Sequence, residues 1–369
     1  MAKIDEIDVN FKANVPDENG IVYYSCFDKP FSLHGFYKPY ELGMLTRLPE
    51  CFREEKGVNR GVRALMNDAT GGRVRFVTDS KTVAIRVKLR TPVSFMPHMA
   101  DTGVLGCDMY VAPIDKSAPP LYKKTFAPLN TSREDAEYSG SFEFDDNDLR
   151  EITINFPLYN GVESLHIGVC DGCTLKEASS YSVEEPIVFY GSSITQGGCA
   201  TRPGMNYPAL LSRWLDADFM NLGFSGSDHG EAALAEHIAE LPMSVFIYAY
   251  GYNAPTKEHY ENTYYPFYKI IRDKNPDLPI IMMSSPVCPD IKTNEVAQKM
   301  IEYREVVMNA YEKAIAEGDK NLYFIDGFTL LGDDEATEAT VDGTHPTDLG
   351  FYNMAKRIYP VLENVLYEA

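Results

Sequence analysis

The sequence from 186 to 195 reads Pro-Ile-Val-Phe-Tyr-Gly-Ser-Ser-Ile-Thr, a short apolar run that ends in a glycine and two serines. An apolar run of this length between turn residues is typical of a buried strand. Similar runs recur down the rest of the chain, and we expect strands at 219–222, 245–250, 280–284 and 322–325. Segments with helical spacing alternate with these runs. The alternation predicts an α/β fold with a doubly wound, flavodoxin-like parallel sheet in a three-layer α/β/α arrangement.

Three helices are expected where apolar residues recur every three or four positions. They cover 207–214, 300–314 and 351–358. Pro360 is expected to kink or end the last helix, because proline lacks an amide hydrogen and crowds the preceding turn.

The first half of the chain has a different period. From about 70 to 170, apolar and polar residues alternate, as they do over 83–89 and 152–156, and Gly, Asn and Asp residues separate the runs. Alternation of this kind indicates half-buried strands. It predicts an antiparallel β-sandwich, jelly-roll-like, with no convincing helix in it.

A chain of 369 residues is longer than a single hydrophobic core usually serves, so two domains are expected. The segment from 174 to 185 is polar and ends at Pro186, which marks the boundary. We therefore expect a β-sandwich over 1–183 and an α/β domain over 184–369.

The net charge of −20 disfavours binding to nucleic acid or to anionic membrane surfaces. No stretch approaches the roughly 18 uncharged apolar residues that a membrane helix needs. The first residues include acidic side chains and no apolar segment, unlike a signal peptide. A cytoplasmic location is therefore expected, although a chain whose leader had been removed would look the same.

The cysteines are odd in number and scattered, so they do not predict a disulfide framework. Cys170 and Cys173 form a lone Cys-x-x-Cys, for which a turn with buried thiols is a more ordinary interpretation than a metal or redox site.

The strongest chemical candidates are a serine after the first α/β strand and an Asp–His pair near the end of the chain. Ser193, or its neighbour Ser192, lies at the predicted strand-to-helix turn, and Asp342 precedes His345 by three positions. A serine hydroxyl needs a neighbouring imidazole to take its proton, and the imidazole needs a carboxylate to fix its tautomer. The ordinary alternatives are a serine that caps a helix and an Asp that caps a helix beside a surface histidine.

An acyl-transfer site also needs donors directed at the oxygen on which negative charge develops. Gly226 and Asn253 follow the second and third predicted strands and supply a backbone amide and a side-chain amide. Glycine and asparagine are also ordinary turn residues. Among the remaining histidines, His98 lies on a loop of the first half, and a buried loop histidine is favoured over one that reaches into a shared cleft.

In the order Ser193, Gly226, Asn253 and Asp342-x-x-His345, these residues resemble the four blocks of the SGNH, or GDSL-type, hydrolases. The resemblance implies that Ser193 is the nucleophile and His345 the base, with Asp342 behind it. It implies that the backbone amides of Ser193 and Gly226 and the side chain of Asn253 form the oxyanion hole. The chain departs from the family pattern at two positions, since Ser192 replaces an Asp and Ala254 follows Asn253.

The first half resembles the β-sandwich that precedes SGNH domains in one esterase subgroup. The signature Gly-x-Asp-Leu-Tyr has its counterpart at 106–110, and the segments 157–162 and 199–204 also look like that subgroup. By the same resemblance Arg202 lines the substrate pocket, with a surface loop arginine as the equal alternative, and His98 is a second candidate for substrate contact.

The resemblance implies a serine esterase that works through an acyl-enzyme and needs no cofactor or metal. It implies small acyl esters, acetyl first, of a carbohydrate, so the expected partner is a small-molecule or oligosaccharide ester; self-association into a homo-oligomer stays open. One alternative is a lipid-type esterase or thioesterase that acts on longer acyl chains. Another is a carbohydrate-binding protein that has lost catalysis.

Overall fold

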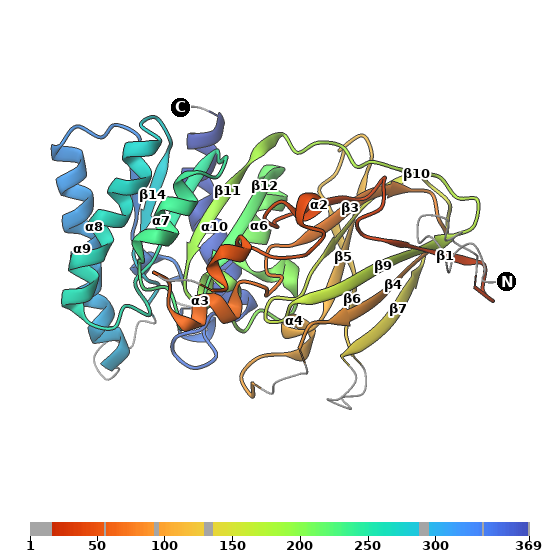
Figure 1. Ribbon diagram of the computed structural model, residues 1–369, viewed down its shortest axis with the longest axis horizontal. Coiled ribbons are helices and arrows are strands. Elements are labelled where there is room, and N and C mark those ends of the chain that lie inside the picture. Colours follow the sequence, from red (N-terminus) through yellow and green to blue (C-terminus); the bar gives the residue numbers. More distant parts are fainter. Residues whose placement is uncertain are drawn as a thin grey trace.

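The structure is a computed structural model that describes residues 17–54, 57–91, 96–128, 136–287, 295–333 and 336–367. Two antiparallel sheets are followed by one five-stranded parallel sheet covered by helices. In Figure 1 the antiparallel strands β1, β4, β7 and β9 lie at one end of the molecule and helices α8 and α9 at the other. The β-sandwich followed by an α/β/α layer structure, as predicted, is confirmed.

The parallel sheet has the strand order β12-β11-β13-β14-β15, which is the flavodoxin-like order. Every neighbouring pair in it is parallel. The strands agree with the five runs expected from the sequence: β11 (Val183–Gly191), β12 (Ala217–Gly223), β13 (Val245–Ala249), β14 (Ile280–Met283) and β15 (Leu322–Ile325).

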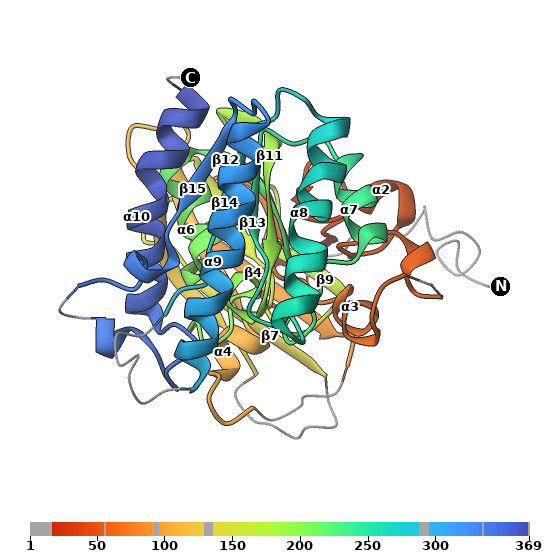
Figure 2. The ribbon, with the colours of Figure 1, turned by 90° about the vertical axis from the view of Figure 1, so that its left-hand side faces the viewer.

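Helices cover both faces of this sheet (Figure 2). One face carries α6 (Tyr207–Leu215) and α10 (Asp348–Tyr367), and the other carries α7 (Ala232–Ala239), α8 (Lys257–Lys274) and α9 (Glu295–Ala316). In β11, Ile187 and Phe189 belong to the core under the first pair of helices, whereas Val188 and Tyr190 belong to the core under the other three. Buried side chains on both faces explain why the strand is apolar throughout rather than alternating.

Pro360 was expected to kink or to end the last helix, and the structure shows that it does not end it. Helix α10 continues through it to Tyr367. Ile358 and Leu362, on either side of the proline, are completely buried. Burial of both flanking turns offsets the loss of one backbone hydrogen bond.

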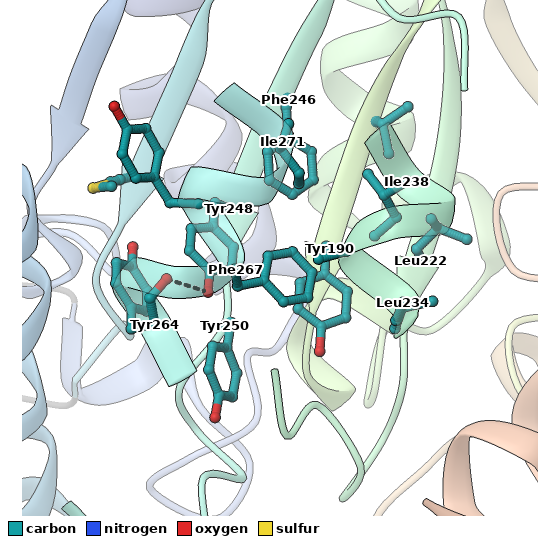
Figure 3. Packing of buried hydrophobic residues seen from close by; sticks show 14 of the residues in the cluster. Tyr190, Leu222, Leu234, Ile238, Phe246, Tyr248, Tyr250, Tyr264, Phe267 and Ile271 are labelled. Carbon is teal, nitrogen blue, oxygen red and sulfur yellow. Dashed lines mark hydrogen bonds between the residues drawn. The ribbon is translucent and has the colours of Figure 1, made fainter. Parts of the chain in front are cut away.

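Aromatic rings fill the core on the α8 side of the sheet (Figure 3). Tyr190 stacks on Phe267 with ring centroids 4.8 Å apart, and Tyr248 stacks on Tyr264 at 4.4 Å. The Tyr248 hydroxyl donates to the Tyr264 carbonyl at 3.1 Å, so its polar end is satisfied although the ring is buried. The stack fixes the strands just before the loops that carry the predicted site.

The antiparallel strands form two sheets with the orders β1-β9-β4-β7 and β10-β3-β8-β5-β6, and β2 pairs with β3 beside the second. The core between them includes Phe76, Ile85, Ile154 and Ile167. A short helix, α4 (Asp101–Val104), lies where no helix was expected. The strands are β1 (Ile21–Ser25), β2 (Ser32–His34), β3 (Arg73–Thr78), β4 (Thr82–Leu89), β5 (Cys107–Pro113), β6 (Leu121–Phe126), β7 (Glu137–Glu143), β8 (Arg150–Asn155), β9 (Val162–Cys170) and β10 (Leu175–Lys176).

The segment between β2 and β3 packs against both parts of the molecule, with Phe36 and Leu45 in the sandwich core and its helices against the parallel sheet. It contains α2 (Pro39–Leu42), a turn of 3-10 helix at Glu50–Phe52 and α3 (Arg60–Leu65). Val62, completely buried, shares a core with Leu222 of β12. This segment lies within the predicted sandwich domain by sequence, so the division at 183/184 stays a prediction.

Further 3-10 turns occur at Pro203–Met205, Gly327–Thr329 and Ala336–Ala339. None of the helices in the described ranges combines the length and the apolar character that crossing a membrane requires.

Candidate active site

The turn after β11 places two serines in different roles. Ser192 is the N-cap of the short helix α5 (Ser193–Gln196), and its hydroxyl accepts a hydrogen bond from the Ile194 amide at 3.2 Å. Ser193 is the first helical residue, so its hydroxyl is not used as a cap. Gly191 is required just before them, because a Cβ there would lie 2.4 Å from the Thr195 hydroxyl. The capping interpretation therefore holds for Ser192 and leaves Ser193 available for chemistry.

Ser193, His345 and Asp342 form a connected set. Ser193 Oγ lies 3.0 Å from His345 Nε2, and His345 Nδ1 lies 2.8 Å from Asp342 Oδ2. The other oxygen of Asp342 accepts the backbone amides of Thr344 at 3.0 Å and of His345 at 2.8 Å. Asp342 therefore closes the turn that carries the histidine and also orients its ring, as the carboxylate of a Ser-His-Asp triad does.

The hydrogen bonds of this turn keep Asp342 ionised. Partial burial raises the pKa of Asp342, but the backbone amide and the ring of His345, with the Thr344 amide, outweigh it and bring the pKa below its ordinary value. The carboxylate is therefore ionised at neutral pH and holds the Nδ1 proton of His345, which leaves Nε2 facing Ser193.

Candidate oxyanion donors follow three adjacent strands. Ser193, Gly226 and Asn253 come after the carboxyl ends of β11, β12 and β13, which are neighbours in the sheet. Within the described ranges, the backbone amides of Ser193 and Gly226 donate to no protein acceptor. Gly226 has a φ of +67°, which favours glycine. Asn253 Oδ1 is buried without a protein partner in the same ranges. The two unpaired backbone amides are what an oxyanion hole requires. Asn253 Oδ1 is an acceptor, so its Nδ2 would have to be the side-chain donor, and the assignment of all three groups stays a prediction.

Replacing Asn253 with alanine is expected to lower kcat by about 10²–10³-fold with little change in KM, because the amide would contact the oxygen only when it is charged. Steady-state kinetics on an activated ester checks this. The exposed Asn147→Ala is the matched control. A variant at Asn253 with a wild-type kcat would contradict the assignment.

A hydrogen-bonded network behind Gly226 was not predicted from the sequence. Gln196 is completely buried, and its Nε2 donates to Asp68 Oδ2 at 2.9 Å and to the Leu158 carbonyl at 3.1 Å. Its Oε1 accepts the amide of Ser225 at 2.9 Å. Asp68 and Leu158, both from the first half of the chain, thus hold Gln196, and Gln196 in turn holds Ser225, the residue before Gly226. The sequence offered one sign of this network, the glutamine at 196 just after the two serines. A glutamine at that place indicates only a loop.

Asp68 should make stability depend on pH. Burial raises the pKa of Asp68 to about 6, although Arg47 and the Gln196 hydrogen bond lower it. The folded-state pKa lies above the ordinary value of about 3.9, so the contribution of this group is present in full below about pH 4 and is lost as the pH rises to about 6. We expect the stability of Asp68→Asn relative to wild type to increase by about 2–3 kcal/mol between about pH 4 and about pH 7.

Urea unfolding at a series of pH values measures this difference, with the exposed Asp277→Asn as control. A difference between Asp68→Asn and wild type that stays constant with pH would contradict the account.

Side chains from the first half of the chain also reach the triad. The His98 ring lies 5.5 Å from the His345 ring, centroid to centroid, and the Tyr159 hydroxyl donates to the Ser193 carbonyl at 3.2 Å. His98 therefore lies beside His345 and is not buried, although a buried loop position was favoured. Contact of His98 with substrate stays a prediction.

Arg202 contacts the sandwich. Its Nη1 donates to Asp108 Oδ2 at 3.0 Å and to the Tyr110 hydroxyl, and its guanidinium lies 4.0 Å from the centre of the Tyr122 ring. It is thus held by the Gly-x-Asp-x-Tyr segment of the first half and is not a free surface arginine. Contact of Arg202 with substrate also stays a prediction.

Asp108 is the centre of this link between the halves. It is completely buried, and its carboxylate also accepts the Gly204 amide at 2.9 Å and Asn155 Nδ2 at 2.8 Å. Asp108→Ala is expected to lower the free energy of unfolding by on the order of 3 kcal/mol, because Arg202 and the two amides lose their acceptor. Chemical denaturation checks this, and a loss no larger than that of the exposed Asp115→Ala would contradict it.

Comparisons with known proteins agree with this architecture. Residues 184–363 match the model of the GDSL-like lipase/acylhydrolase family, and residues 21–175 match that of the GxDLY domain, the N-terminus of SGNH-hydrolase-type esterases. No curated protein sequence matches the chain.

Solved structures resemble the chain over nearly its whole length. A GDSL-like lipase from Bacteroides ovatus has a TM-score of 0.83 and 28% identity, covering 94% of this chain and 98% of that one. A salicylyl-acyltransferase from a tetracycline biosynthetic pathway has a TM-score of 0.75 and 19% identity over 95% and 99%. The acetyl xylan esterase Est2A from the rumen bacterium Butyrivibrio proteoclasticus has a TM-score of 0.54 and 15% identity over 94% and 98%. The last two share the fold.

Both halves of the chain thus match the two parts of one kind of enzyme. The chain belongs to the GDSL-type family of SGNH esterases, in the group that carries a GxDLY domain before the catalytic domain.

Proposed function

We propose that the protein hydrolyses small acyl esters, acetyl first, of a carbohydrate through an acyl-enzyme on Ser193. The observation that carries the mechanism is the linked pair of distances, 3.0 Å from Ser193 Oγ to His345 Nε2 and 2.8 Å from His345 Nδ1 to Asp342 Oδ2. Both lie within the range in which a proton is transferred or held.

In the first half-reaction, Ser193 Oγ attacks the ester carbonyl while His345 Nε2 takes the serine proton. The carbonyl oxygen becomes negatively charged, and the amides of Ser193 and Gly226 with the side chain of Asn253 would donate to it. His345 then returns the proton to the leaving alcohol, and the C–O bond to that alcohol breaks.

In the second half-reaction, water attacks the acyl-serine. His345 takes a proton from that water and gives it back to Ser193 Oγ as the acid leaves. Asp342 stays ionised throughout and stabilises the imidazolium that forms in each half-reaction.

The choice of substrate rests on similarity to a solved structure. Est2A is an acetyl xylan esterase by its name, and it has the same two-part fold. Around the nucleophile loop, a Cβ on Gly198 would lie 2.8 Å from the Tyr159 hydroxyl and 3.2 Å from Met99 Cε, both from the first half of the chain. The first half of the chain thus packs directly against the nucleophile loop.

A series of nitrophenyl esters from acetyl to dodecanoyl tests the acyl preference. We expect kcat/KM to be highest for acetyl and to fall as the chain lengthens. A maximum at octanoyl or longer would contradict the acetyl proposal and favour the lipid-type esterase. Release of acetate from acetylated xylan oligosaccharides, compared with acetylated non-carbohydrate alcohols, tests the carbohydrate part.

A non-catalytic carbohydrate-binding protein is disfavoured, because the three triad residues are connected by hydrogen-bonding distances. Absence of turnover on every ester in the series, by protein that binds xylan oligosaccharides, would favour that alternative.

A further inference from the structure

Three metal-binding side chains meet beside the triad. They are His98 from the loop before α4, Cys199 from the loop after α5, and His345. One ligand atom from each lies within 4.8 Å of the other two. In the described part of the chain, this is the one group of His, Cys, Asp and Glu residues so arranged.

These atoms suit zinc better than a hard cation. Two imidazole nitrogens and one thiolate are the ligands that zinc prefers, and three protein ligands with a water complete a tetrahedron. Zinc–nitrogen and zinc–sulfur bonds of about 2.0–2.3 Å put two ligand atoms roughly 3.5 Å apart, so small side-chain rotations would close the site. The net charge of −20 attracts cations to the protein in general.

The surroundings of His345 already have the form of a metal-bound histidine. Metal-ligating histidines usually donate their second ring N–H to a carboxylate, which fixes the tautomer. Asp342 Oδ2 lies 2.8 Å from His345 Nδ1, so Nε2 is the nitrogen left for an ion. The same Nε2 faces Ser193 Oγ at 3.0 Å.

The thiol is placed by an unusual backbone. Cys199 has a φ of +73°, in the left-handed region that residues other than glycine seldom adopt, and it is 6% exposed. Its side chain is therefore shielded from solvent at the edge of the sandwich core, with Sγ within 4.8 Å of the two histidine nitrogens.

We propose that His98, Cys199 and His345 bind a zinc ion, and that zinc inhibits the enzyme by occupying His345 Nε2. As the zinc–sulfur bond forms, the thiol proton passes to the buffer. Bound zinc removes the base from Ser193, so the ion and catalysis exclude each other. The inhibitory part rests on the proposed function, whereas the binding part does not.

Binding is tested on metal-free full-length protein by calorimetric titration with zinc, and with cobalt(II) as a spectroscopic probe. We expect one ion per chain and a near-ultraviolet thiolate-to-cobalt band. Cys199→Ser should abolish the band, and both Cys199→Ser and His98→Phe should weaken zinc binding at least about tenfold. Cys51→Ser, which removes an exposed thiol, should bind like wild type.

Ser193→Ala keeps all three ligands and should bind zinc like wild type although it is inactive. Titration of this variant with zinc separates the proposed metal site from the proposed esterase function, because it measures zinc binding without any substrate. Equal zinc affinity in wild type, Cys199→Ser and His98→Phe would overturn the site.

Inhibition is measured as the zinc concentration that halves the rate of each variant relative to its own metal-free rate. We expect this concentration to rise at least about tenfold in Cys199→Ser, in step with the lost affinity. One-to-one binding at this site without loss of activity would overturn the inhibitory part alone.

Discussion

Replacing Ser193 with alanine is expected to lower kcat by at least about 10³-fold while the protein stays folded. In the proposed mechanism the hydroxyl is the attacking group, and its oxygen lies 3.0 Å from His345 Nε2. Alanine is tolerated at the first position of a helix, and Ser193 is not the residue that caps α5. Steady-state kinetics on an acetyl ester measures the loss, and circular dichroism with urea unfolding confirms the fold.

Ser192→Ala is the matched control because it removes the neighbouring hydroxyl. That hydroxyl accepts the Ile194 amide, so its removal should cost about 1 kcal/mol of stability and little of kcat. If Ser193→Ala keeps its activity and Ser192→Ala loses it, the nucleophile has been assigned to the wrong serine.

Asp342→Asn is expected to lower kcat by about 10³–10⁴-fold with little effect on KM. The asparagine oxygen can still accept the amides of Thr344 and His345, so the turn should survive. Its NH₂ group would then face His345 Nδ1 as a second donor. The ring would move its proton to Nε2 and could no longer accept the proton of Ser193.

The measurement is kcat across pH, together with unfolding by urea to show that the turn is retained. Asp333→Asn, at a carboxylate that is 83% exposed, is the control and should behave like wild type. A near-wild-type kcat for Asp342→Asn would show that His345 is oriented by something other than this carboxylate.

The α/β half could be predicted well because its signals are local. Each strand is a short apolar run, and in β11 successive residues pack on opposite faces, as a sheet covered on both sides requires. The prediction that Pro360 would kink or end the last helix considered only the local effect of proline on the backbone. Helix α10 continues through Pro360 because Ile358 and Leu362 on either side are buried. Tertiary packing decided that case against local preference.

The contact between Ser193, His345 and Asp342 could be expected because these residues occur along the chain in a family order and Ser193 follows the end of β11. The supporting residues could not, since their partners are far away in sequence. Asp68 meets Gln196 across 128 positions, and Asp108 meets Arg202 across 94. No periodicity or motif in one sequence indicates such pairs.

The first half of the chain is more than a neighbour of the active site. Asp68 fixes the loop before Gly226 through Gln196, Tyr159 donates to the Ser193 carbonyl, and His98 lies against His345. Changes at these residues of the first half should therefore alter catalysis as well as stability.

Covalent labelling of the nucleophile tests the central claim most directly. Wild-type protein is incubated with an organophosphate ester that reacts with activated serines, digested, and analysed by mass spectrometry. The account predicts one label per chain, on Ser193, and its loss in His345→Ala. A label on Ser192 or on any residue other than Ser193 would contradict it.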